Sequence, residues 1–244
     1  ALKLGVIDEA SRDAGKAVEG ADLVLLGTPV GQMSAVMAEI APHLSPETVL
    51  CDGGSTKQDV IRSARRKLGK RFSRFVPSHP IAGTEHSGAA AAFPELYRNR
   101  NVILAPQKET DADAVRLVRA AWQACGANIV RLDPKRHDEI FGAVSHLPHV
   151  VAFALVSMLA QRKNAPELLG FSGAGLRDTV RIAGSSPEMW RDICVANCDA
   201  MVELMDSYMA ELKKARVAIR KADGDSLQKI FEQAKAARER WLLK

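Results

Sequence analysis

Residues 22–28, with the sequence DLVLLGT, are almost entirely apolar and end at Thr28-Pro29. A helical pattern follows directly, over residues 31–44. A short, continuously apolar run is typical of a strand that is buried on both faces, as strands of parallel sheets are. This stretch therefore predicts a strand followed by a crossover helix, which is the repeating unit of an α/β fold.

The same alternation continues toward the C-terminus. Further strands are expected at residues 48–52, 74–77, 101–105 and 128–132, and further helices at residues 57–68 and 111–125. This order predicts a doubly wound, mainly parallel Rossmann-type sheet. Because open sheets of this kind bind ligands beyond the carboxyl ends of their strands, chemistry is expected in the residues that directly follow each strand.

The usual opening of a dinucleotide-binding domain is not found in this sequence. Such a domain begins with a strand, a GxGxxG turn and a helix, but the 244 residues contain no GxGxxG. Residues 1–10 instead indicate the end of a helix and a loop. We therefore expect an N-terminally incomplete sheet, whose first β-α-β unit would precede Ala1.

The character of the sequence changes after Asp133-Pro134. One long, mostly apolar helical pattern is expected over residues 135–161, and no strand pattern follows it. Further helical segments are expected at residues 165–169, 175–183, 187–217 and 225–243. We predict a dinucleotide-binding domain at residues 1–134 and an all-α domain at residues 135–244, which forms a homodimer because its helices are apolar on more than one face.

Composition narrows the class of protein. Hydrophobic residues make up 47% of the chain, which is enough to bury a large core. We expect no apolar run to approach the roughly 20 residues that cross a bilayer, and no signal-peptide pattern is found, so a cytoplasmic enzyme without a membrane partner is expected. The net charge of +5 lies largely on C-terminal helical segments with few aromatic residues, which argues against nucleic-acid binding. Four cysteines without a CxxC pair do not indicate a disulfide framework.

The strongest candidate for chemistry is residues 78–85, SHPIAGTE, directly after an expected strand. Pro80 favours an extended conformation at His79. An imidazole with an ordinary pKa of ~6.5 accepts a proton near neutral pH, so His79 is a candidate general base. From the residues alone, a histidine that only hydrogen-bonds its own loop is an equally good interpretation.

His146 and His149 lie three residues apart in the segment SHLPH of the long helix, and they share a face. Pro148 is expected to kink the helix and free the carbonyl of Val144. The two histidines could be active-site residues or a metal pair, although no carboxylate at ligand spacing completes a metal site.

Two further patterns have structural alternatives. Arg177 and Arg181 share a helix face and repel unless an anion lies nearby, but Asp178 could also pair with one of them. Ser55 follows two glycines after an expected strand, but with Gln58 it also forms a capping-box pattern at the start of a helix.

Taken together, these motifs resemble those of the prephenate and arogenate dehydrogenases. The four segments occur in the family's order and spacing, from about Gly5 to about Arg220; they are DGGSTK, SHPIAGTEHSG, SHLPHVVAFAL and RIAGSSPEMWRDI. The resemblance implies oxidative decarboxylation of a cyclohexadienyl acid on the route to tyrosine, with hydride transfer to NAD or NADP. It leaves open prephenate against arogenate and NAD against NADP.

The resemblance also implies roles for individual residues. His79 matches the catalytic histidine, and Ser55 matches a residue that hydrogen-bonds it near the nicotinamide. His149 matches a residue at the side-chain end of the substrate, and Arg181 matches an arginine that holds a carboxylate. Weaker matches place further residues at the substrate, namely His146, Arg177, Glu85 and Trp190, and others at the cofactor, namely Thr28, Pro29 and Gln32. A solvated Glu85 and a core Trp190 are the alternatives.

Two other classes of protein compete with this interpretation. The β-hydroxyacid dehydrogenases and pyrroline-carboxylate reductases also join a Rossmann domain to a helical domain, but they lack the SHPIAGTE and SHLPH segments. A non-catalytic helical dimer with a broken nucleotide fold is the third interpretation, and the missing glycine-rich turn motivates it.

Overall fold

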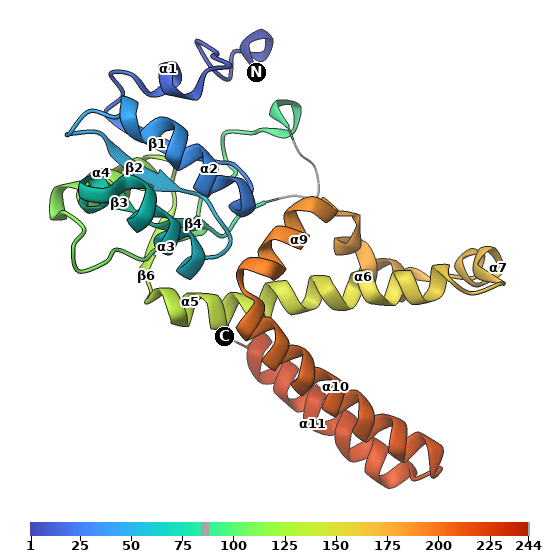
Figure 1. Cartoon of the computed structure of the whole chain (residues 1–244). Coiled ribbons are helices and arrows are strands. Elements are labelled where there is room, and N and C mark those ends of the chain that lie inside the picture. Colours follow the sequence, from blue (N-terminus) through green and yellow to red (C-terminus); the bar gives the residue numbers. More distant parts are fainter. Residues whose placement is uncertain (84–87, 244) are drawn as a thin grey trace. The chain divides into compact units, whose positions relative to one another are not determined.

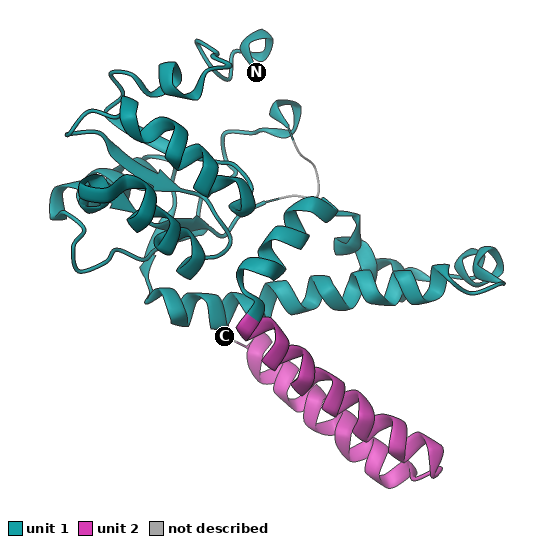
Figure 2. Ribbon diagram, viewed as in Figure 1, with its two compact units in different colours: residues 1–198 teal, residues 199–244 magenta. Residues whose placement is uncertain are grey.

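The computed structural model describes residues 1–83 and 88–243. The chain divides into two compact units, Ala1–Cys198 and Asp199–Lys244, which Figure 2 shows in different colours. The predicted domain boundary at residue 134 lies inside the first unit and stays a prediction.

The α/β part of the first unit contains all six strands of the described chain. Strands β1 (Leu23–Leu26), β2 (Val49–Asp52) and β3 (Phe75–Val76) pair in parallel in that order. Strands β4 (Ser78–Pro80), β5 (Asn101–Leu104) and β6 (Asn128–Arg131) form a second three-stranded sheet. The predicted doubly wound α/β class is confirmed.

One strand was not expected. Residues 78–80 were predicted to be a loop, but they form β4 and pair antiparallel with β5, with His79 opposite Ile103. Pro77 separates β3 from β4, and its carbonyl accepts a hydrogen bond from the amide of Ala105. Because Pro80 holds His79 extended, this segment can join the ladder instead of turning away from it.

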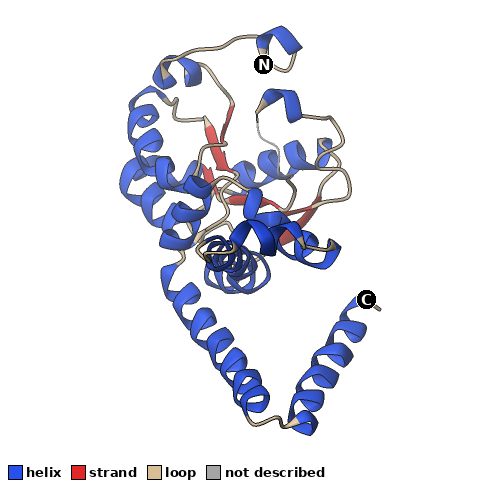
Figure 3. Cartoon of the chain, turned by 90° about the vertical axis from the view of Figure 1, so that its right-hand side faces the viewer, coloured by secondary structure: helices blue, strands red, loops and turns tan. Residues whose placement is uncertain are grey.

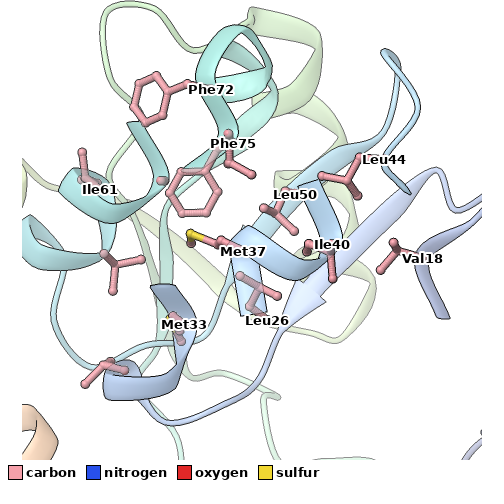
Figure 4. Close-up of a cluster of buried hydrophobic side chains, with 14 of the residues drawn as sticks. Val18, Leu26, Met33, Met37, Ile40, Leu44, Leu50, Ile61, Phe72 and Phe75 are labelled. Atoms are coloured by element: carbon pink, nitrogen blue, oxygen red, sulfur yellow. The ribbon is translucent and has the colours of Figure 1, made fainter. Parts of the chain in front are cut away.

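Helices cover both faces of this part, so the strands lie between helical layers in Figure 3. On one face, α2 (Val30–Ile40) and α3 (Gln58–Leu68) pack on a core that includes Leu26, Leu50 and Phe75 (Figure 4). On the other, α4 (Ala112–Ala124) packs against Val49 and Cys51. Neighbouring residues of β2 thus face opposite layers, which is why the first three residues of this strand, residues 49–51, are apolar.

Residues 1–10 were expected to be the end of a helix and a loop, and a further short helix follows them in the structure. A 3-10 turn spans Leu2–Leu4, and a short helix, α1 (Ala14–Val18), begins at Asp13, whose carboxylate accepts a hydrogen bond from the amide of Lys16. This is a normal N-terminal cap, and it explains why so short a helix forms.

The long helix predicted over residues 135–161 is interrupted. It consists of α5 (Pro134–Phe141), a π-helical turn (Gly142–His146) and α6 (Leu147–Ala160). Figure 1 shows α6 continuing roughly in the direction of α5, so a π turn stands where a kink was predicted. Pro148 has no amide hydrogen to donate, which is the physical reason for an irregular turn just before it.

This stretch also corrects the expectation about apolar runs. Residues Pro134–Ala160 are long and apolar enough, by length and composition, to span a membrane, and only 11% of their most apolar stretch is buried. Core helices of other proteins can have the same length and composition. An exposed apolar surface of this kind is typical of a site that contacts a partner.

The remaining helices contain a second interruption. After α7 (Ala165–Gly170) and α8 (Ala174–Val180), one helix was predicted over residues 187–217, but Asn197 divides it into α9 (Pro187–Ala196) and α10 (Cys198–Arg220). Its side chain bonds to neighbours on α5 and the π turn, as described below. The second unit consists of most of α10 and of α11 (Gly224–Leu242), and Asp223 caps α11.

Candidate active site

His79 lies on β4 with its ring against the start of the long helix. Its Nδ1 is 2.8 Å from Nε2 of His137 on α5. Its ring also contacts Phe141 edge-on, with the centroids 4.9 Å apart. The extended backbone that Pro80 favours therefore places the imidazole of His79 against α5.

His137 is in turn bonded to the carboxylate of Asp138. Nδ1 of His137 is 2.8 Å from Oδ1 of Asp138, and both side chains are essentially buried. The same carboxylate accepts hydrogen bonds from the amides of Lys57 and Gln58, at 2.8 and 2.9 Å. Asp138 thus joins α5 to the start of α3 and ends a chain of contacts that begins at His79.

The surroundings of His79 disfavour its charged form. Burial lowers its pKa well below the ordinary value of 6.5, and the nearby charges of Lys57, His137 and His146 lower it further. Burial also lowers the pKa of His137, although the bond to Asp138 works against this. Both rings are therefore neutral near pH 7, and a neutral imidazole can accept a proton.

A buried ion pair holds the loop next to His79. The ammonium group of Lys57 donates hydrogen bonds to Asp52 and to the carbonyl of Ser78, and both charged side chains are completely buried. Asp52 also accepts hydrogen bonds from the amides of Ser78 and Gly54. Because these bonds satisfy both charges, they fix the end of β2 against the start of β4.

Ser55 lies in this loop and does not cap α3. The residue before α3 is Lys57, whose side chain makes no capping hydrogen bond. The carboxylate of Asp138 accepts the hydrogen bonds of the amides that a capping side chain would otherwise bind. The capping alternative for Ser55 is therefore wrong. The Ser55 backbone is hydrogen-bonded to His146, which places this loop at the π turn.

His146 and His149 both contact Trp190. The ring of His149 stacks on Trp190 with the centroids 3.5 Å apart, and the ring of His146 meets Trp190 edge-on at 6.0 Å. Burial lowers the pKa of His146 to about 4, and Asn197 lies 3.2 Å from its Nδ1. In the described part of the chain, no three His, Cys, Asp or Glu side chains form a group able to hold a metal ion.

Trp190 was interpreted either as a core tryptophan or as a residue at the substrate. It is packed into the hydrophobic core that includes α2 and α3. Its Nε1 is nevertheless buried, and no hydrogen-bond partner for it is found among the described residues. A buried donor without a partner is costly.

Arg181 extends this cluster at its outer end. It is exposed at the start of a 3-10 turn, Arg181–Gly184. Burial is the main cause of the lowered pKa of His149, and the charge of Arg181 lowers that pKa further. Arg177 and Asp178 are exposed one turn earlier on α8. Glu85 lies outside the described residues.

The cofactor residues lie after β1. Pro29 precedes α2, Gln32 is exposed in its first turn, and Oγ1 of Thr28 is buried without a partner among the described residues. Gly31 lies close to α9, because a Cβ atom at that position would meet the carboxylate of Asp192, which would have to move. A free hydroxyl beside the positive end of a helix fits a polar cofactor.

Several residues of the site were missed from the sequence. They are Asp52, Lys57, His137, Asp138 and Asn197. Lys57 and Asp52 stand in the quoted DGGSTK segment, so an apolar strand that ends in a carboxylate was an available clue. Nothing local distinguishes His137-Asp138 or Asn197, since their bonds join residues far apart in the sequence.

Comparison with known proteins identifies both halves of the chain. Residues 1–131 match the nucleotide-binding domain of prephenate dehydrogenase, and residues 133–233 match its dimerization domain. A cyclohexadienyl dehydrogenase from Zymomonas mobilis is 39% identical over 240 residues, which cover 98% of this chain and 80% of the relative. A prephenate dehydrogenase from Bacillus subtilis is 37% identical over 241 residues, and the chain covers 65% of its length.

Solved structures agree with these matches. The crystal structure of prephenate dehydrogenase from Aquifex aeolicus in complex with hydroxyphenyl propionate and NAD+ has a TM-score of 0.89 and 35% identity. The match covers 98% of this chain and 84% of that one. The Synechocystis arogenate dehydrogenase has a TM-score of 0.78 and 26% identity, over 98% of this chain and 86% of that one.

Proposed function

Because the chain belongs to the prephenate dehydrogenase family, we propose that it oxidises and decarboxylates prephenate, arogenate or both, with hydride transfer to a nicotinamide. This is the prephenate or cyclohexadienyl dehydrogenase reaction of tyrosine biosynthesis. The observation that carries the proposal for this site is a neutral, buried His79 that lies in one connected cluster with Ser55, His146, Trp190, His149 and Arg181.

His79 is the general base. Its Nε2 accepts the proton of the ring hydroxyl while the hydrogen on the same carbon leaves with its electron pair, and the C–O bond becomes a carbonyl. The bound cofactor, NAD or NADP, supplies the acceptor for that hydride. The bond to the ring carboxylate then breaks, carbon dioxide leaves, and its electron pair makes the ring aromatic. The residues need only align the hydroxyl, the base and the hydride path.

The other residues hold the two reactants. Arg181 binds a carboxylate of the acid and His149 binds its side-chain end, because a guanidinium suits a carboxylate and the His149 ring is fixed by Trp190. His146, Arg177, Trp190 and Glu85 complete the substrate side of the proposal. Ser55, Thr28, Pro29 and Gln32 are proposed to face the cofactor, at the carboxyl ends of β1 and β2.

The proposal includes a homodimer formed by the helical domain. The match to a dimerization domain supports this, as do exposed apolar residues on the π turn and α6, such as Val144 and Met158. Burying that surface against a second copy removes it from water and accounts for its composition without a membrane. Light scattering after gel filtration is expected to give twice the mass of one chain, and a monomer at micromolar concentration would contradict the proposal. A cytoplasmic location belongs to the same proposal.

An assay with four substrate pairs tests the reaction. Prephenate and arogenate are each supplied with NAD and with NADP, and reduced nicotinamide and carbon dioxide are measured together. At least one pair is expected to give both products in equal amounts. Reduced nicotinamide without carbon dioxide, or no turnover with any pair, would refute the proposal.

A further inference from the structure

We propose that Asp138 and His137 are positioning residues that hold His79 in the one tautomer whose Nε2 can accept a proton. The inference rests on the proposed role of His79 as the base. The two residues touch neither substrate nor cofactor in this scheme, and they act only through the ring of His79.

The first step concerns the carboxylate of Asp138. Burial alone would raise its pKa, but the hydrogen bonds from His137 and from the amides of Gln58 and Lys57 outweigh burial and lower it. An ionised carboxylate only accepts hydrogen bonds. Nδ1 of His137, which lies 2.8 Å from Oδ1 of Asp138, must therefore carry a hydrogen.

The second step passes this assignment to His79. A neutral imidazole carries one N–H, so a hydrogen on Nδ1 of His137 leaves its Nε2 as an acceptor. That nitrogen lies 2.8 Å from Nδ1 of His79, and a bond at this distance requires a hydrogen on one of the two atoms. The hydrogen must belong to Nδ1 of His79, which leaves Nε2 of His79 unprotonated.

The opposite assignment fails at each contact. A hydrogen on Nε2 of His137 would turn the lone pair of its Nδ1 toward the Asp138 carboxylate, in a site without exposure to water. Two acceptors that face each other in a buried site are costly. Asp138 therefore sets the direction of the hydrogen bonds from His79 through His137 to its own carboxylate. Both positioning residues occupy consecutive positions in α5.

Other charged groups around His79 do not reverse this direction. Lys57 lies on the loop before α3, and its charge is committed to Asp52 and the carbonyl of Ser78. His146, on the π turn, is hydrogen-bonded to the Ser55 backbone and contacts Asn197. Lys57, His137 and His146 all favour a neutral His79, and only the His137 contact also selects which nitrogen carries the hydrogen.

Two substitutions at one position separate positioning from structure. In His137→Leu, nothing accepts the hydrogen of His79 Nδ1, so we expect kcat to fall about 10- to 100-fold, below the full worth of a positioned base. The KM for the acid and the Kd for the nicotinamide should stay within about twofold. In His137→Gln, an amide can donate to Asp138 and accept from His79, so much of kcat should return. His43→Leu, on the exposed surface, is the matched control and should keep wild-type kcat.

The tautomer itself is measured by 15N NMR of histidine-labelled protein at neutral pH. His79 of the wild type should show a protonated Nδ1 and an unprotonated Nε2, and His137→Leu should shift the population toward a protonated Nε2. A protonated Nε2 in the wild type would overturn the proposal, even if His137→Leu does not fold. So would a His137→Leu enzyme with unchanged kcat.

These readouts distinguish failure here from failure of the proposed function. If the wild type oxidises neither acid, the proposed reaction is refuted, but the NMR result still decides whether Asp138 and His137 set the tautomer of His79. If the wild type is active and the tautomer does not respond to His137, only the positioning proposal fails.

Discussion

At the scale of single residues, the site depends on keeping its histidines neutral. Burial is the largest cause of the lowered pKa at His79, His137, His146 and His149. A neutral ring is the form that accepts a proton, and it also costs less to bury than a charged one. The chemistry expected of His79 and the stability of its surroundings therefore favour the same protonation state.

Arg181 gives a prediction at this scale. Arg181→Gln removes the charged donor proposed for a substrate carboxylate, and a charged hydrogen bond contributes about 1.5–3 kcal/mol. We expect the KM for the acid to rise at least about tenfold in steady-state kinetics, with a much smaller change in kcat. Arg66→Gln removes the same charge from an exposed position in α3 and should leave KM unchanged. An unaltered KM in Arg181→Gln would remove this residue from substrate binding.

What the sequence could predict at this scale depended on local pattern. His79, Ser55 and Thr28 follow apolar strands, so their place at the carboxyl ends of the strands was predictable. Asp138 and Asn197 could not be found in the same way, because each is defined by bonds to distant residues, such as Lys57 to Asp138 and Asn197 to His146. The capping interpretation of Ser55 failed for this reason, since a residue from α5 occupies the cap.

At the scale of elements, apolar runs predicted the strands and most helices well. The errors came where one residue bonds against the local pattern. Strand β4 forms because the extended segment around His79 finds a partner in β5. Asn197 stands in a continuous helical pattern, yet its side chain donates to the carbonyl of Asp138 at 2.9 Å and the helix ends there. Side chains of this type compete with helical hydrogen bonds, and sequence periodicity does not show it.

Asn197→Ala tests this account of the helix break. The substitution leaves the Asp138 carbonyl and Nδ1 of His146 without that partner in a buried site, which costs about 1–3 kcal/mol. The free energy of unfolding in urea should fall by that amount. Asn164→Ala, at an exposed asparagine before α7, should change it by less than about 0.5 kcal/mol. Equal effects of the two substitutions would show that Asn197 has no special role.

At the scale of the whole molecule, the family match settles what the sequence left open between classes. Matches over residues 1–131 and 133–233 place the chain in the prephenate dehydrogenase family. The chain is therefore not assigned to the related reductases or to a family of non-catalytic dimers. Periodicity could predict an α/β part followed by helices. The mostly apolar helical pattern over residues 135–161 also indicated a surface for a second subunit, but periodicity does not say which of residues 134–160 that subunit would cover.

The buried histidines predict how the stability of the molecule depends on pH. His79, His137 and His146 have a lower pKa in the folded chain than the ~6.5 of an unfolded one, so the unfolded state binds more protons below that pH. The contribution of these histidines to the free energy of unfolding should therefore have its full value above pH ~6.5 and should fall as the pH drops toward about 4. Each histidine contributes up to about 1.4 kcal/mol per pH unit in that window.

Urea unfolding at fixed protein concentration, from pH 7 to pH 5, measures this slope. The raised pKa of Asp59 acts in the opposite direction near the acid end, and the lowered pKa of Asp138 acts only below about pH 4. Stability that stays constant or rises on acidification would contradict the burial of three neutral histidines.

The most direct test of the central claim is the rate of hydride transfer in His79→Asn, measured in single turnovers with saturating acid and nicotinamide. Asparagine cannot take up the hydroxyl proton, so we predict a loss of roughly 10²–10⁴-fold, with the Kd of the nicotinamide unchanged. His43→Asn should transfer hydride at the wild-type rate. A His79→Asn enzyme within a few-fold of the wild type would show that this ring is not the base.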